Sequence, residues 1–175
     1  MVWLLVFLEI VTFGAGLGVF LFQGRDHAAA FEEGRALLNQ PLALANTLVL
    51  LTGGWCMAAC LAGLRLGRTS TALRWILGAV ASGLLFLVLK AVEFAEKIRH
   101  GIGFGEDVFF TLYYALTGFH FIHVLVAVVL LSFMARGLRH GRYHRDDHLD
   151  VESCGIFWHM CDLIWLLLFP ILYLL

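Results

Sequence analysis

The chain has 175 residues, of which 61% are hydrophobic and only 14% are charged. A water-soluble domain is nearer half apolar and a quarter charged, so this composition indicates an integral membrane protein. The formal net charge of −1 excludes a strong overall field that would attract nucleic acid, and we expect no nucleic-acid partner. The four cysteines lie in apolar runs without C-x-x-C or zinc spacing, which favours buried thiols over a metal site.

Five long apolar runs predict the architecture. A membrane-spanning helix needs about 20 predominantly apolar residues, and each of the runs meets this length. The sequence therefore predicts an all-α integral membrane protein, a bundle of five transmembrane helices in a single membrane domain over residues 1-175. The expected helices cover about residues 2-22, 42-64, 73-95, 108-135 and 153-175.

The first run carries one acid, Glu9, and two glycines, Gly14 and Gly18, at a spacing that lets another helix approach closely. In the polar linker that follows, residues 28–38 predict a short helix lying on the surface.

The third run ends with Lys90, Glu93 and Lys97, which are spaced for local ion pairs along one helix. The long side chains at this end can also reach the membrane interface.

The short loops predict the orientation of the helices. The second and fourth loops together hold seven arginines, whereas the first and third hold four basic residues. Basic residues are enriched in cytoplasmic loops. We therefore expect a cytoplasmic N-terminus and a C-terminus on the opposite side of the membrane.

Five titratable side chains in three of the runs could share one layer of the membrane. Counted from the cytoplasmic end at about 1.5 Å per residue, all five lie between about 9 and 21 Å deep. Because a buried charge needs a partner or must be neutralised, a cluster bridging the helices would satisfy them. The five residues are Glu9, His120, His123, His159 and Asp162.

Three interpretations compete for these residues. In a small membrane b-type cytochrome, His120 or His123 would ligate haem together with His159. In a proton- or ion-conducting bundle, the acids would mark a pathway, although transporters usually show repeated topology or broken helices. In a structural network, the histidines and acids would fix helix packing within a larger complex. Spacing alone favours the structural network, and no pattern typical of an enzyme active site occurs.

Two motifs near the C-terminus resemble a known family. The run 117–124, Thr-Gly-Phe-His-Phe-Ile-His-Val, closely resembles the TGFHGLHV motif of cytochrome c oxidase subunit III. Glu152 followed by Phe-Trp-His-Met-Cys-Asp-Leu-Ile-Trp-Leu over 157–166 resembles that family's E…YWHFVDVVWL.

Three further segments resemble the same family in the same order. Residues 40–47 are similar to its PLLNT segment, and residues 90–94 lie where it has QxxEY, with Lys90 in place of the glutamine. Glu9 matches the membrane glutamate of its SEVMFFxG helix, although Leu8, Val11 and Thr12 depart from that pattern. The resemblance covers essentially the whole chain.

The resemblance implies an accessory, non-catalytic subunit of a haem–copper oxidase or of its nitric oxide reductase relative, in a bacterial inner membrane. Such a subunit carries no haem or copper; these cofactors belong to the catalytic subunit on which it docks. The family fold has a lipid-holding cleft between its first pair of spans and the rest, so bound phospholipid is expected. This chain is similar to the five-span form that lacks the first two spans, and its length favours the form that accompanies nitric oxide reductase.

The resemblance also implies roles for particular residues. Glu9 corresponds to the family's carbodiimide-reactive glutamate, in an interhelical network that would serve as a lipid or proton site. The other residues at motif positions are Glu93, His120, His123, Glu152, His159 and Asp162.

Overall fold

The computed structural model describes residues 2–145 and 147–175. These residues form six helices: α1 (Val2–Asp26), α2 (Ala28–Ala36), α3 (Gln40–Arg65), α4 (Thr69–Arg99), α5 (Val108–Arg139) and α6 (Leu149–Tyr173). All except α2 are long and apolar enough to cross a membrane, which confirms the predicted all-α architecture with five spans.

The spanning helices extend beyond the apolar runs from which they were predicted. α1 ends at Asp26 instead of near residue 22, and α4 continues to Arg99 instead of ending near residue 95. Hydropathy marks the part of a helix that lies in hydrocarbon, whereas backbone hydrogen bonding continues into the polar headgroup region. The predicted surface helix over 28–38 is α2, which ends at Ala36.

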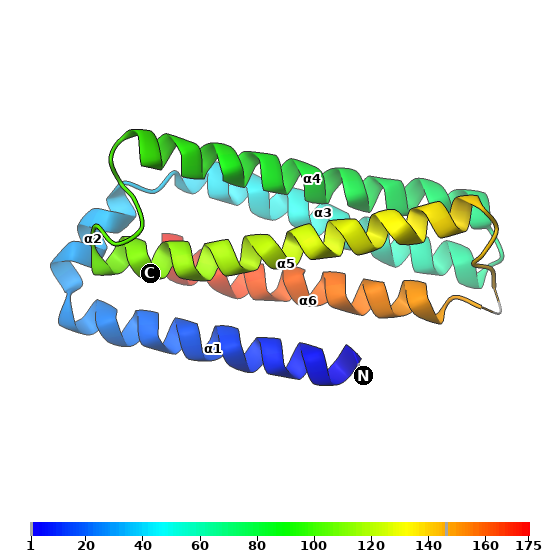
Figure 1. Cartoon of the computed structure of the whole chain (residues 1–175), viewed down its shortest axis with the longest axis horizontal. Helices are drawn as coiled ribbons and strands as arrows, with labels where there is room; N and C mark the ends of the chain where they lie inside the picture. Colours follow the sequence, from blue (N-terminus) through cyan, green and yellow to red (C-terminus); the bar gives the residue numbers. More distant parts are fainter. Residues whose placement is uncertain (1, 146) are drawn as a thin grey trace.

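Four of the helices, α3 to α6, form an antiparallel bundle, and α1 lies against one side of it (Figure 1). α3 packs against α4 and α6, and α5 packs against the same two helices from the other side. α1 contacts α5 and α6, and in this helix only Phe13, Leu17 and Phe20 are buried. α1 begins in the half of the bundle that carries the two arginine-rich loops, but short of the loops themselves (Figure 1).

Local signals explain where α3 begins and ends. The Asn39 side chain accepts a hydrogen bond from the Leu42 amide at 3.1 Å, and Pro41 lies in the first turn, where no amide donor is needed. After the helix, Gly67 has a φ of +72°, a conformation that favours glycine, and this permits the tight turn into α4.

Three phenylalanines hold α1, α2 and α5 together at the end of the bundle opposite the arginine-rich loops. The ring centroids of Phe20 and Phe31 are 4.9 Å apart, and each ring also meets Phe109, at 5.7 and 5.2 Å. A Cβ atom at Gly34 would collide with the Phe109 ring. The short helix α2 can therefore lie flat across the bundle end because glycine leaves room for this aromatic ring.

The centre of the bundle is close-packed around Trp158 of α6. An added Cβ at Gly53 of α3 or at Gly83 of α4 would lie 2.7 Å from this indole ring, closer than carbon atoms approach in proteins. Two glycines on adjacent helices thus create the space for the largest side chain of the core.

Candidate functional site

Glu9 and His123 form a pair between α1 and α5. The carboxylate Oε2 of Glu9 lies 3.2 Å from Nε2 of His123, and both side chains are largely shielded, with 20% and 13% of their surface exposed. The imidazole is flanked by the rings of Phe13 and Phe119, with centroids 5.7 and 4.6 Å away. The pair is therefore a polar contact within an aromatic environment.

The second ring nitrogen of His123, Nδ1, contacts the backbone of its own helix. Nδ1 lies 2.8 Å from the carbonyl oxygen of Phe119, which can only accept, so Nδ1 must carry a proton. The other nitrogen, Nε2, is the ring atom that faces the Glu9 carboxylate.

His159 and Asp162 form a second pair, on α6 beside α3. Nδ1 of His159 lies 3.4 Å from Oδ2 of Asp162, and 47% of the histidine side chain is exposed while the aspartate is buried. A Cβ at Gly54 of α3 would collide with Oδ2 of Asp162, so glycine there allows the carboxylate to sit against the backbone. The pair lines a shallow hollow of about 370 Å³ on the outer α3–α6 surface, together with apolar side chains such as Trp55.

His120 occupies an aromatic cage in the interior. Its side chain is fully buried, and neither ring nitrogen has a hydrogen-bond partner among the described residues. The imidazole stacks on Trp165 at 5.3 Å and meets the edges of Phe86 and Phe13 at 5.8 and 6.1 Å. A haem iron could reach this imidazole only if these rings were displaced, so the cage does not fit the haem-ligand interpretation.

The five residues that were expected to form one cluster in the same layer of the membrane are therefore separated in the structure. Glu9 meets His123, and His159 meets Asp162, but the two pairs lie on different sides of α6, and His120 stands apart from both. Depth along a helix is a single coordinate, whereas contact also depends on the direction in which each side chain points.

A third polar group, which joins α4, α5 and α6, is the most completely buried. Nζ of Lys90 donates to Glu93 Oε2 at 3.0 Å, to the Tyr113 hydroxyl at 2.9 Å and to the Tyr173 hydroxyl at 2.5 Å. Both hydroxyls donate in turn to Oε1 of Glu93, at 2.8 and 3.0 Å. All three ammonium protons are thus used, and no member of the group is left without a partner.

Aromatic rings complete the environment of this lysine. Its Nζ lies about 5 Å from four ring centroids, among them Phe94 at 5.1 Å and Trp165 at 5.3 Å. Such cation–π contacts stabilise a charge that water does not reach.

The structure confirms the expected pair of Lys90 with Glu93, at 3.0 Å, but corrects the expectation that Lys90 can reach the membrane interface. The side chain is 1% exposed and points into the bundle. Sequence reasoning identified Glu93 but missed Tyr113 and Tyr173, because residues separated by 60 positions share no periodic pattern. One signal in the sequence could have found them. A lysine inside an apolar helix needs polar partners, and Tyr113 and Tyr173 are hydroxyl-bearing residues on two other apolar helices.

Glu152 lies apart from these groups, at the arginine-rich end. Its Oε1 accepts from Arg65 at 2.9 Å and lies 3.2 Å from Nε2 of His148. The carboxylate therefore ties the start of α6 to the end of α3.

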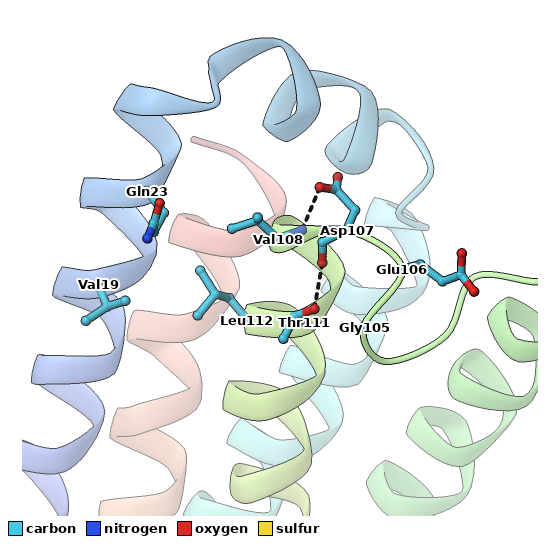
Figure 2. A pocket seen from close by; sticks show the side chains of 8 residues that line it. All are labelled: Val19, Gln23, Gly105, Glu106, Asp107, Val108, Thr111 and Leu112. Atoms are coloured by element: carbon cyan, nitrogen blue, oxygen red, sulfur yellow. Dashed lines mark hydrogen bonds between the residues drawn. The ribbon is translucent and has the colours of Figure 1, made fainter.

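A hollow of about 420 Å³ lies at the opposite end, between α1 and the loop that precedes α5 (Figure 2). Figure 2 shows the Asp107 carboxylate turned back to accept from the Val108 amide, while the Asp107 carbonyl accepts from Thr111. Gln23 lines this space from α1, and Glu106 belongs to the loop that lines it, although its carboxylate points away from α1 (Figure 2). Asp107 caps the start of α5, so its position beside the hollow has a structural reason and does not indicate a binding site.

Comparison with known proteins assigns the chain to a family. A family model described as Cytochrome c oxidase subunit III matches residues 35–175. The chain belongs to the cytochrome c oxidase subunit III family. This confirms the resemblance of its motifs, and most of the polar residues described above, from Glu93 to Tyr173, lie within the matched part.

Individual relatives extend the match to the first helix. Cytochrome c oxidase subunit 3 of Thermostichus vulcanus is 31% identical over 98% of this chain and 85% of its own length. The corresponding subunit of Synechocystis sp. is 31% identical over 82% of this chain. The "Heme-copper oxidase subunit I+III" of Aeropyrum pernix is 26% identical over 98% of this chain. The chain spans 22% of the Aeropyrum protein and 60% of the Synechocystis protein.

Proposed function

We propose that this multi-pass membrane protein is an accessory, non-catalytic subunit of a haem–copper oxidase. It docks on the catalytic subunit, stabilises it and supports its proton uptake or its assembly. Membership of the subunit III family supports this proposal. The Aeropyrum relative adds to this support, because its name joins subunits I and III in one protein.

The observation that carries the proposal is the exposed histidine on the α3–α6 face. His159 lies ten residues from the start of α6, which is about 15 Å into the helix at the usual rise. Titratable side chains at such a depth rarely face lipid and normally face protein or a water-filled cavity. Around it, Trp55 and Leu163 are also exposed. The α3–α6 face is therefore the surface that the catalytic subunit covers.

Each polar group then has a role in the complex. The buried group around Lys90 fixes the geometry of α4, α5 and α6. The Glu9–His123 pair, a carboxylate beside an imidazole between α1 and α5, is the candidate for a contribution to proton uptake.

The orientation follows from the arginine-rich end. The loops after α3 and α5 lie at this end and α1 begins in the same half of the bundle, so a cytoplasmic N-terminus and a C-terminus on the outer side agree with the positive-inside rule (Figure 1). A C-terminal tag should be cleaved by protease added to spheroplasts, from which the outer membrane barrier has been removed. Protection of the tag until the spheroplasts are lysed would contradict this orientation.

The test is co-purification in mild detergent from native membranes. Tagged wild-type chain should recover a haem–copper catalytic subunit, identified by mass spectrometry. His159→Ala should reduce the recovery about tenfold, the effect of losing one buried polar contact across an interface. The matched control is Val92→Ala, at an exposed position of α4, which should recover the partner as the wild type does.

The other outcomes separate the alternatives. Recovery of a nitric oxide reductase would indicate that the chain serves in denitrification. Recovery of no respiratory subunit would overturn the proposal. A haem absorption band that belongs to the isolated chain would instead indicate a small b-type cytochrome.

A further inference from the structure

An apolar groove runs between α4 and α5, and we call it the α4–α5 groove. Its volume is about 1070 Å³. Residues between Leu73 and Leu84 of α4 form one wall, and residues between Leu125 and Ala135 of α5 form the other. Most of its length is therefore lined by aliphatic side chains.

The groove ends in a cluster of basic side chains. Arg136, Arg139 and His140 line this end, and none of the described residues that line the groove carries a carboxylate. Among the residues that the structure describes, neither Arg136 nor Arg139 forms an ion pair through its side chain. Arg65, at the same end of the bundle, differs because it is paired with Glu152.

The length of the groove matches one leaflet of a bilayer. The eleven-residue step from Leu73 to Leu84 corresponds to about 16 Å of helix. Half of a typical hydrocarbon core is about 15 Å. The basic end coincides with the arginine-rich end of the bundle, where the positive-inside rule places the cytoplasmic headgroups.

We propose that the α4–α5 groove is a binding site for one anionic phospholipid. Arg136 and Arg139 hold the phosphate-containing headgroup, and an acyl chain lies along the aliphatic walls. Basic pockets between transmembrane helices on the cytoplasmic side bind anionic headgroups in this way. The site is separate from the Glu9–His123 pair, because α1 packs against α5 and α6 and not along the groove. It also does not depend on which catalytic subunit the chain docks on.

The charge selection is tested with the full chain in detergent, together with any partner that co-purifies. Native mass spectrometry would compare bound phosphatidylglycerol with phosphatidylcholine of the same acyl chains. The wild type should prefer phosphatidylglycerol by about 30-fold, as expected for two arginines near a headgroup. The double variant Arg136→Gln/Arg139→Gln should bind both lipids equally. The control Arg68→Gln, exposed in the turn before α4, should keep the preference.

The position of the acyl chain is tested with a matched pair on α5. Val129 lines the groove and Val126 does not, and the two side chains are similarly exposed, at 45% and 43%. Val129→Trp should displace the lipid, whereas Val126→Trp should leave it bound.

Two results would overturn the proposal. The first is equal binding of the two lipids by the wild type, which would show that the arginines select no charge. The second is retention of phosphatidylglycerol by both the double arginine variant and Val129→Trp, which would place the lipid elsewhere. Neither result bears on co-purification with a catalytic subunit, so the failure of this proposal is distinguishable from failure of the proposed function.

Discussion

The bundle of α3 to α6 and the helix α1 differ in how they hold polar and small residues. The bundle encloses Lys90 and Glu93 completely and satisfies them from three helices, and two of its glycines, Gly53 and Gly83, lie against the ring of Trp158. In α1 the acid Glu9 forms a partly exposed pair, and an added Cβ at Gly14 or Gly18 would meet nothing within 4 Å. The difference shows that the bundle encloses its own charged centre, whereas α1 holds its acid near the surface and leaves two glycine positions free for lipid or a partner.

The largest expected effect comes from the charged centre of the bundle. Lys90→Met leaves Glu93 buried without its cation, and we expect a loss of about 3–5 kcal/mol in the free energy of unfolding. The double variant Lys90→Met/Glu93→Gln removes both charges and should recover most of this loss. Denaturant unfolding in detergent measures both. If the double variant were as unstable as the single one, the ion pair would not be the organising feature of the bundle.

The glycines provide the next test of the difference between the bundle of α3 to α6 and the helix α1. Gly83→Ala would press a methyl group against Trp158 and Val128, and we expect it to cost about 1–3 kcal/mol. Gly18→Ala has open space around it and should be neutral or stabilise the helix by up to about 1 kcal/mol. Thermal unfolding of the two variants side by side checks this. Equal destabilisation would mean that α1 is packed as closely as the bundle.

The smallest expected effect concerns the pair on α1. Glu9→Gln keeps the shape of the side chain and removes its charge, so we expect a loss of about 1 kcal/mol or less. The bundle should remain intact, as monitored by unfolding of α3 to α6 through tryptophan fluorescence. A loss as large as that of Lys90→Met would show that α1 is an integral part of the bundle.

Much of the architecture could be predicted because its cause is local. Apolar length alone predicts five spans, and the runs around His120 and His159 carry motifs specific enough to indicate the family. The pairing of His159 with Asp162 was also within reach, since residues three apart on a helix lie on one face.

The remaining features depend on contacts between distant parts of the chain. Helical periodicity shows that Lys90 and Glu93 share a face, but it does not show that Tyr113 and Tyr173 meet them there. It also cannot tell that His120 faces an aromatic cage while His159 faces outward.

The sequence by itself determined that this protein is a membrane bundle of the subunit III family, because hydropathy and short motifs are properties of contiguous residues. Only the tertiary structure decided which polar groups are enclosed and which reach the surface. The rotation of each helix about its axis determines those contacts, and packing against its neighbours sets that rotation. The α4–α5 groove and the buried lysine are both products of that packing.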